Sequence, residues 1–492
     1  MPIPFSQMPS TTRRPGVYAE VDNSRALQAQ QPQQARILMF AQRTSAGSVA
    51  ALVPTVTPSA EKAKSYFGAG SMAHLMTKAL KDNNEDIELT VIPVDDAGGG
   101  AAHAQTITVT ASSTLAGTLY LYISGQLVAV PVAASDAQNT IAATINTYIN
   151  ANNNLPVTST VSTNVVTVTA KNKGVLSNDI DIRVNYRELS GGEKYPGGVS
   201  VAVATTVAGS TDPSTIANAI AAIPEESYDF VIWPWTDDTN MDLIEAEMDR
   251  RWLPGVKLYG HVFACVDDVL ADLSTYGTAR NSQHSTVFGV DDSPSAPYEI
   301  AAAHVGAVAT RISNNPARPT HGLKVRTVLP PSFSSNKRFQ NTEMETLLYD
   351  GISPLRVQER TADIYTSRMI TTYQTNAADT PDPSYLDITT MFTLSAVCKS
   401  LDAALQQEFT GFSIVDDGNR LTEFQTSPSH IKSFVVAHFK QLQDQGLVEN
   451  IDQFKRDIRV ERAEDPTRVN ILWPGNLANP LYVLAVNVQF RL

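Results

Sequence analysis

Serine and histidine side chains are the first candidates for chemistry in this sequence. Ser71 lies among small residues in Gly68–His74 (GAGSMAH), where a serine hydroxyl can act as a nucleophile if a histidine and an acid assist it. His261 and His304 each have a carboxylic residue nearby in sequence, but both lie in or beside apolar runs. Ser71 also directly precedes an apolar pattern of helical spacing, where a serine hydroxyl caps the helix. We therefore predict a helix cap and two core or surface histidines rather than a catalytic triad.

Metal and phosphate sites find no better support. The sequence contains no CxxC, no HExxH and no histidine pair at helical spacing, and no glycine-rich loop ends in GK[ST]. Five pairs of adjacent aspartates occur, but adjacent side chains do not share a face, so such pairs are typical of turns and strand ends. These pairs are Asp95-Asp96, Asp237-Asp238, Asp267-Asp268, Asp291-Asp292 and Asp416-Asp417. We predict no catalytic residue, no cofactor and no metal site.

The composition of the chain limits the functional classes to which the protein can belong. The chain has 492 residues, enough for about three domains, and a net charge of −13 that argues against a nucleic-acid partner. No apolar stretch approaches the roughly 20 residues of a membrane span, so direct membrane insertion is not expected. The amino end lacks the apolar core of a secretory signal. Cys265 and Cys398 lie in separate apolar runs, and we expect two buried free thiols in a protein that folds in a reducing cytoplasm.

Two stretches of the chain, residues 31–96 and 209–384, alternate between strand and helix patterns. Predicted strands lie at 37–40, 88–93, 230–233, 262–266 and 287–290, with helices at 71–81, 241–251 and 301–312 between them. Asp212 before Pro213 predicts the start of a further helix. Such alternation indicates an α/β core with a parallel-type sheet covered by helices.

A segment of different character, residues 97–208, separates these stretches. Residues 97–200 hold only ten charged residues and no Phe or Trp, and alternate at period two in several short runs. The runs lie at 107–110, 118–123, 127–132 and 165–170, with one helix near 140–149. Glycine clusters at both edges are placed like hinges. We predict an inserted β-rich domain.

The carboxy-terminal region, residues 385–475, predicts an α+β domain. An apolar stripe from Leu394 to Phe409 indicates one amphipathic helix, and a second begins at Ser427-Pro428 and stops at Gly446. Lys432 and Lys440 lie off the apolar stripe of the second helix. Before this region, 357–365 and 370–373 suggest paired strands.

Both ends of the chain carry a strand without a hairpin partner. Residues 1–30 form a Pro-rich arm that contains the short β pattern Gly16–Val21 (GVYAEV), and residues 476–492 end in the apolar strand Leu481–Phe490 (LYVLAVNVQF). Either strand can pair within its own subunit. Alternatively, each completes a sheet in a neighbouring subunit, and identical head-to-tail joins of this kind generate rings or helical polymers.

Several segments resemble contractile phage tail sheath proteins of the Mu-like type. The resemblance is carried by PGVYAEVDNSRA (Pro15–Ala26), LLYDGISPLRV (Leu347–Val357), RMITTY (Arg368–Tyr373) and YLDITTMFTLSAV (Tyr385–Val397). The insert, with GTLYLYISGQLVAVPV and VTVTAKNKG, is similar to the β-domain often inserted in these sheaths.

This resemblance implies a subunit that stacks as hexameric rings around a tail tube and contracts to drive the tube through a bacterial envelope. The partners would be other copies of the chain, the tail tube protein, and the baseplate and tail terminator proteins. Such a virion protein is assembled in the host bacterial cytoplasm, and its insert would lie on the outside. The resemblance also implies a core like that of subtilisin in fold only.

The resemblance assigns roles to individual residues. The donated strands would comprise Gly16, Val17, Tyr18, Ala19, Glu20 and Val21 at one end and Tyr482, Val483, Leu484, Ala485, Val486, Asn487, Val488, Gln489 and Phe490 at the other. The acceptor sheet would lie in residues 385–475, and Lys432 and Lys440 would be candidates for contact with an acidic tube. The segments 28–34 and 474–480 would be the hinges.

Two other classes remain open on the sequence alone. One is a tail tube or other virion scaffold protein, although the length and α/β core disfavour a simple tube subunit. The other is a hydrolase built on the α/β core, although in subtilisin-type proteases the order is Asp, His, Ser, whereas Ser71 lies near the start of this chain.

Overall fold

The computed structural model describes residues 35–491 apart from 333–335 and 359–360. The predicted amino-terminal strand Gly16–Val21 lies outside the described residues.

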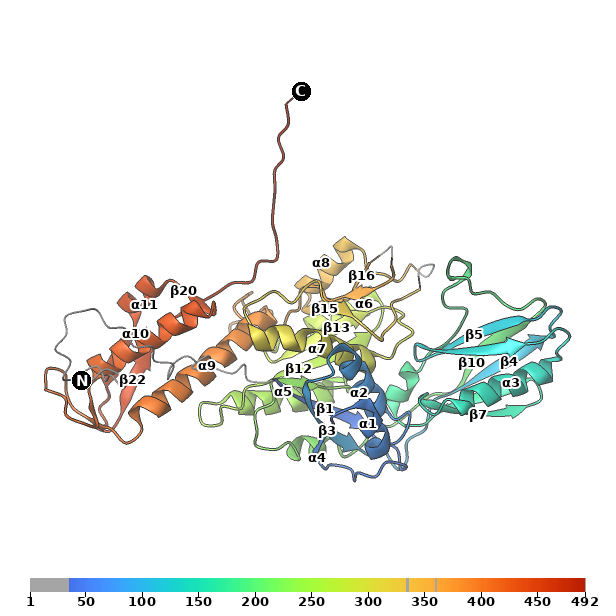
Figure 1. Ribbon diagram of the computed structural model, residues 1–492, viewed down its shortest axis with the longest axis horizontal. Helices are drawn as coiled ribbons and strands as arrows, with labels where there is room; N and C mark the ends of the chain where they lie inside the picture. Colours follow the sequence, from blue (N-terminus) through green and yellow to red (C-terminus); the bar gives the residue numbers. More distant parts are fainter. Residues whose placement is uncertain (1–34, 333–335, 359–360, 492) are drawn as a thin grey trace, which may run out of the picture. The chain divides into compact units, whose positions relative to one another are not determined.

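A seven-stranded sheet forms the centre of the fold, in the order β15-β13-β12-β11-β1-β3-β2 (Figure 1). All neighbouring pairs are parallel except β2 with β3. The strands are β1 (Arg36–Gln42), β2 (Thr55–Val56), β3 (Glu88–Val94), β11 (Phe230–Ile232), β12 (His261–Asp267), β13 (Ser285–Val290) and β15 (Ile352–Pro354). The predicted parallel-type sheet is therefore present.

Helices cover both faces of this sheet. One face packs on α1 (Ala60–Phe67), α2 (Met72–Asn83), α7 (Pro297–Asn314) and the start of α9 (Ile388–Phe409). The other face packs on α4 (Ile216–Ala221), α5 (Asp238–Trp252), α6 (Leu270–Thr278) and α8 (Asn341–Tyr349). The middle of strand β1 is apolar because both of its sides are buried. Ile37 and Met39 enter the first core, whereas Leu38 and Phe40 enter the second.

The insert, residues 97–208, has its own sheets and its own apolar core. Its elements are β4 (Ala104–Ala111), β5 (Gly117–Ile123), β6 (Gln126–Val132), α3 (Gln138–Ala151), β7 (Val157–Ser162), β8 (Val165–Ala170), the 3₁₀ turns Val175–Asp179 and Leu189–Gly191, β9 (Ile182–Val184) and β10 (Ser200–Val207). They form an antiparallel four-stranded sheet, β10-β4-β8-β7, and a three-stranded one, β6-β5-β9. Helix α3 contributes Ile141, Ile145 and Ile149 to a core that this segment does not share with the central sheet.

The insert is fastened to the α/β core by buried and half-buried polar contacts. Ser124 donates to the Glu299 carboxylate at 2.9 Å, and Arg183 contacts Asp292 at 2.7 Å. The Tyr186 hydroxyl donates to the Pro330 carbonyl oxygen at 2.5 Å. Contacts from two separate parts of the insert, the turn between β5 and β6 and the region of β9, therefore fix its orientation against the core.

The carboxy-terminal region continues from α9 through several short elements (Figure 1). These are β18 (Ser413–Ile414), β19 (Gln425–Thr426), α10 (Pro428–Asp444), β20 (Val448–Glu449), α11 (Ile451–Asp457), β21 (Arg459–Arg462), β22 (Val469–Leu472) and β23 (Asn476–Leu477). Helix α10 begins as predicted, with the Ser427 hydroxyl accepting from the His430 amide and Pro428 in the first turn.

Two local predictions are wrong, and one helix was not predicted. Asp212 does not cap a helix: its carboxylate accepts from the Val175 amide of the insert, and α4 begins only after Thr215. The segment 370–373 is not a strand, because Ile370 makes only an isolated bridge to Asp387. The short strands nearby are β14 (Lys324–Val325), β16 (Arg356–Val357) and β17 (Ile364–Tyr365). Helix α8 was not expected at all.

Helix α9 is long and apolar enough to cross a membrane by length and composition, the one such helix among the described residues. Core helices pass the same test. Here Ile388 and Phe392 pack in the core of the central sheet, and Lys399 pairs with Asp229 at 2.7 Å. These contacts account for the apolar composition of α9 without a bilayer.

Candidate assembly interface

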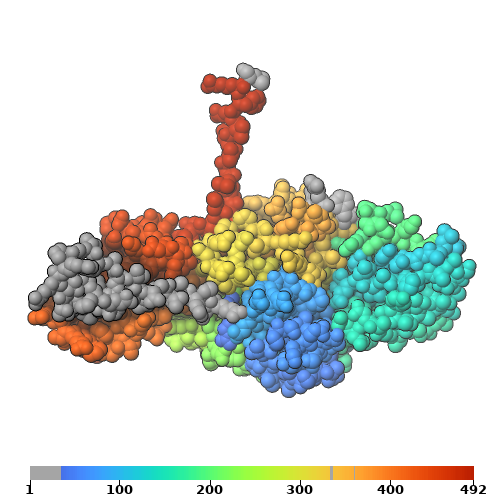
Figure 2. Space-filling model, viewed as in Figure 1, coloured from blue at the N-terminus to red at the C-terminus, as the bar shows by residue number. Residues whose placement is uncertain are grey.

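The carboxy-terminal arm has no partner strand among the described residues. Leu481–Phe490 was predicted as a long strand, but the structure pairs none of these residues. The arm stands clear of the other described residues, and apolar side chains such as Val486 and Phe490 are each 80% exposed (Figures 1 and 2). An extended apolar segment with free main-chain donors and acceptors favours pairing with another strand.

The base of the arm is fastened at two places. Strand β23 pairs with β20, and the Ala478 amide donates to the Leu447 carbonyl at 3.0 Å. Four residues later, Tyr482 packs against residues of the α/β core. The predicted hinge at 474–480 is therefore hydrogen-bonded, and the free length begins at Val483.

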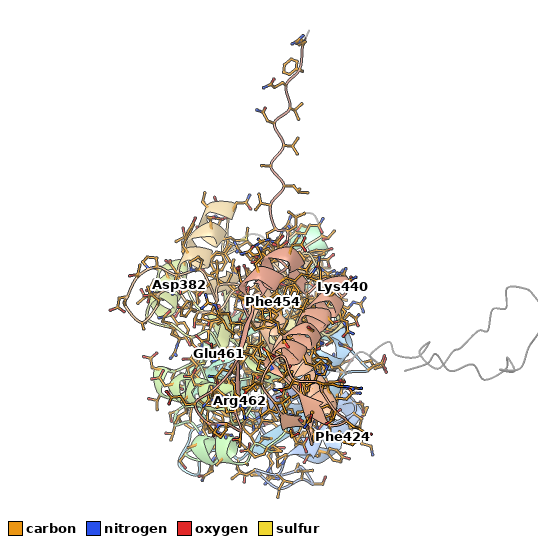
Figure 3. The ribbon with its side chains drawn as sticks, turned by 90° about the vertical axis from the view of Figure 1, so that its left-hand side faces the viewer. Asp382, Phe424, Lys440, Phe454, Glu461 and Arg462 are labelled. Carbon is orange, nitrogen blue, oxygen red and sulfur yellow. The ribbon has the colours of Figure 1, made fainter. Side chains whose placement is uncertain are left out.

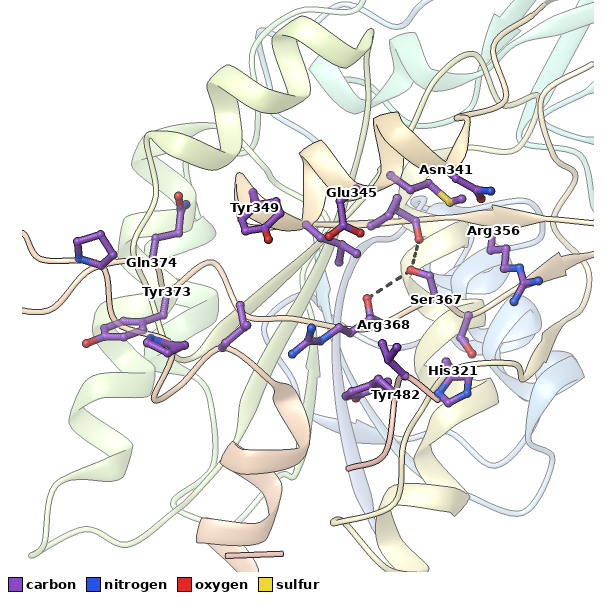
Figure 4. Close-up of a pocket in the computed structure, with 18 of the residues that line it drawn as sticks. His321, Asn341, Glu345, Tyr349, Arg356, Ser367, Arg368, Tyr373, Gln374 and Tyr482 are labelled. Carbon is purple, nitrogen blue, oxygen red and sulfur yellow. Dashed lines mark hydrogen bonds between the residues drawn. The ribbon is translucent and has the colours of Figure 1, made fainter. Parts of the chain in front are cut away.

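Tyr482 lies between a cation and a second ring (Figure 4). The Arg368 guanidinium carbon is 4.9 Å from the centre of the Tyr482 ring, and the His321 ring centre is 5.5 Å away. Arg368 is itself held by Asp387 through two hydrogen bonds of 2.9 Å. Burial raises the pKa of the Tyr482 hydroxyl to about 12. This hydroxyl lies near Thr320 and Thr389 but forms no hydrogen bond.

An open two-stranded sheet is present in the carboxy-terminal region. Strands β21 and β22 form an antiparallel hairpin in which Val460 faces Ile471 and Glu461 faces Asn470. Within the described ranges neither strand has a second neighbour, so both outer edges carry unpaired main-chain groups. A two-stranded hairpin is marginal by itself and gains stability from an added strand or from packing.

Packing holds this hairpin in place (Figure 3). Val460, Val469 and Ile471 contact an apolar cluster built from α10 and α11. At the centre of that cluster the rings of Phe439 and Phe454 stack with centroids 3.9 Å apart. The hairpin is thus a preformed template with one face partly buried and, among the described residues, two unpaired edges.

Lys432 and Lys440 lie on α10, about 12 Å apart along the helix axis. Lys440 is exposed and Lys432 half-buried (Figure 3). No ion pair to either is found in the part of the chain that the structure describes. Both charges are available to a partner, but the structure contains none.

The residues considered first for chemistry have structural roles. The Ser71 hydroxyl accepts from the His74 amide at 3.2 Å, which confirms the predicted helix cap, and it donates to the Gly68 carbonyl. His74 accepts from the Gly70 amide, and burial lowers its pKa to about 4. Among the described residues no carboxylate is hydrogen-bonded to His74, so they form no triad around Ser71.

The other two histidines are core residues. His261 is hydrogen-bonded to Thr286 at 2.8 Å, and burial lowers its pKa to about 3. His304 donates from Nδ1 to the Ile300 carbonyl, with its pKa lowered to about 4 by burial. Both are neutral at physiological pH, and neither contacts the carboxylate near it in sequence.

The acidic pairs occupy turns and caps. Asp237 caps α5, Asp267 accepts from the Asp292 and Ser293 amides, and Asp417 accepts from the Ser429 amide. Over residues 35–491, outside the two short gaps, no three His, Cys, Asp or Glu side chains gather in a way that could hold a metal. Cys265 is buried and Cys398 half-buried, and both are free thiols.

The β21–β22 hairpin and the packing of Tyr482 against the α/β core were not predicted from the sequence. Residues 459–462 (RVER) and 469–472 (VNIL) alternate around an Asp-Pro turn, a signal too short to separate from a loop. Nothing in the pattern of the arm distinguishes Tyr482 from the residues that follow it.

Comparisons with known proteins agree on one class, structural proteins of phage tails. The family model described as the phage tail sheath C-terminal domain matches residues 380–491. The Mu-like prophage FluMu tail sheath protein of Haemophilus influenzae is 32% identical over 495 residues, with both chains covered completely. The chain therefore belongs to the family of phage tail sheath proteins, of the Mu-like type. The family is structural rather than enzymatic.

Solved sheath proteins are also similar to this chain. The sheath tail protein of Listeria innocua is 15% identical with a TM-score of 0.49, covering 91% of this chain and 92% of its own. That of Desulfitobacterium hafniense is 13% identical with a TM-score of 0.48, covering 97% and 100%. A chain of the contracted baseplate of the anti-feeding prophage is 10% identical with a TM-score of 0.45, covering 99% and 100%.

Proposed function

We propose that this tail sheath subunit polymerises as stacked hexameric rings around a tail tube and contracts to drive the tube through the bacterial envelope. The observation that carries the proposal is that the described residues include both an unpaired apolar arm and a hairpin with two open edges. A strand from one copy can complete the sheet of the next, and identical head-to-tail joins of this kind generate rings or open helical polymers.

The donated strands are the arm residues Tyr482–Phe490 and the amino-terminal residues Gly16–Val21. The acceptor is the hairpin of β21 and β22. Since Tyr482 is packed on its own subunit, the paired part of the arm comprises the residues beyond it. Strand pairing of this kind preserves main-chain hydrogen bonds while the subunits shift, which a two-state polymer requires.

The body of the subunit moves as a unit in this proposal. Helix α9 joins the α/β core to the carboxy-terminal region, and two ion pairs brace it: Lys399 with Asp229 at 2.7 Å and Lys257 with Asp402 at 2.5 Å. The aromatic ring of Phe392 stacks on Phe230 with centroids 4.8 Å apart. Contraction would then change contacts between subunits rather than within them.

Each predicted segment of the chain has its own structural role in this proposal. Residues 1–30 and 476–492 are the arms, 31–96 and 209–384 the sheath core, 97–208 an outer domain and 385–475 an inner domain. Lys432 and Lys440 on α10 would face an acidic tube surface. The remaining partners are the baseplate and tail terminator proteins, and assembly takes place in the host bacterial cytoplasm.

Deletion of residues 481–492 tests the proposal. Electron microscopy of the full chain is expected to show long hollow polymers, and the truncated chain should remain a folded monomer with unchanged circular dichroism. As a matched control, replacing Val203 and Val207 with Thr removes exposed apolar side chains from β10, and this variant should still polymerise. Polymers of the truncated chain would overturn strand donation by this arm.

A further inference from the structure

A groove of about 970 Å³ begins where the arm leaves the subunit. Its volume is at the upper end of the range for small-molecule pockets. One wall is α8, from which Met344, Leu348 and Tyr349 contribute apolar surface (Figure 4). The loop that contains Pro381 and Pro383 provides further apolar lining.

Two of the four Asp, Glu and Arg side chains that line the groove are engaged, whereas Glu345 and Arg356 are exposed. Arg368 is paired with Asp387, and Asp382 accepts from the Tyr373 hydroxyl at 2.8 Å. What remains accessible is mainly apolar, including Tyr349, whose side chain is 77% exposed. An exposed apolar surface of this kind marks a binding site.

The arm is continuous with this groove. Tyr482 and Val483 are themselves lining residues, so the chain enters the groove before it departs from it. The next seven residues, Leu484–Phe490, carry no charge, and each apolar side chain among them is exposed. Eight residues from Val483 onward reach about 26 Å when extended, enough to follow a groove of this size.

We propose that the groove is a docking site for the arm of its own chain, Val483–Phe490, in the subunit before assembly. Docking covers the apolar side chains that strand donation will later use, and polymerisation then begins with release of the arm. The groove thus regulates assembly by competing with the hairpin of a neighbouring subunit. This inference rests on the proposed function, because the competing event is strand donation.

A disulfide test distinguishes this occupant from others. In a Cys398→Ser background, Glu345→Cys on the groove side of α8 is combined with Leu484→Cys or Val486→Cys in the arm. Thr346→Cys, one residue further along α8 and outside the groove, replaces Glu345→Cys in the control. Dilute monomers are separated by size, oxidised mildly and analysed by peptide mass spectrometry, and chains carrying a single cysteine each are mixed to detect links between copies.

The groove variants should form an intrachain link several-fold more than the Thr346→Cys control, and the link should disappear in polymers. Monomers with no excess over the control would overturn the proposal. A link found only between mixed chains would also overturn it, because the occupant would then be a second copy. Electron microscopy of the wild type reports separately on the proposed function: polymers without an intrachain link leave that function intact.

Discussion

The guanidinium of Arg368 lies 4.9 Å from the ring centre of Tyr482 and is held there by the two oxygens of Asp387. This contact marks the point beyond which the arm is unpaired and where the strand that we propose is donated begins. The face of the Tyr482 ring contacts the Arg368 cation, whereas the Tyr482 hydroxyl is buried without a hydrogen bond.

Substitution of Tyr482 tests this anchor. Tyr482→Phe should leave assembly unchanged or slightly improved, because the buried hydroxyl has no hydrogen bond to lose. Tyr482→Ala removes the ring and a cation–π contact of about 1 kcal/mol, so the residues around 479–483 should exchange amide hydrogens faster and polymers should be shorter. Equal behaviour of the two variants would show that the ring does not anchor the arm.

Glu299 predicts a pH dependence of stability. Burial raises its pKa from 4.5 to about 7, so the folded protein binds a proton more tightly here than the unfolded chain does. The stabilisation that Glu299 contributes is fully present below about pH 4.5 and is lost as the pH rises through 7. The free energy of unfolding falls by about 3 kcal/mol over this range.

Glu299→Gln keeps an acceptor for Ser124 and removes the titration. Chemical denaturation should therefore show little difference from the wild type at pH 5 and a more stable variant at pH 8. Glu61→Gln, at a side chain that is 84% exposed, serves as the control and should change neither value. A wild-type advantage at pH 8 would contradict the buried neutral carboxyl.

Charge reversal on α10 tests the tube contact. Lys432→Glu with Lys440→Glu places two negative charges where we propose an acidic tube, so co-assembly with tube should weaken and become less sensitive to salt. Sheath polymerisation without tube should be unaffected. As a control, Lys194→Glu makes the same kind of charge reversal at an exposed lysine of the insert. If both sets of variants bind tube equally well, α10 does not face it.

Local signals predicted much of the core, and the failures have physical causes. Strand β1 and helices α2 and α10 follow from apolar periodicity and from the caps Ser71 and Ser427. Asp212 has the side chain and the following proline of a cap, but the Val175 amide, distant in sequence, takes its carboxylate. Such competition cannot be found from local pattern.

Helix α8 shows a signal that was present but not used. Gln340 and Glu343 form a capping box, although only Leu347 of this helix is fully buried and the apolar stripe is correspondingly weak. The arm is the opposite case. Its period-two pattern is that of a strand, yet residues 35–491, outside the two short gaps, contain no partner for it, and the pairing that we propose is between subunits.

The most direct test of strand donation is an electron cryomicroscopy map of the polymer in which the main chain can be traced. The account predicts that residues 483–490 of one subunit lie hydrogen-bonded along β21 or β22 of another. Polymers in which this arm is unpaired, or pairs only with its own subunit, would contradict it.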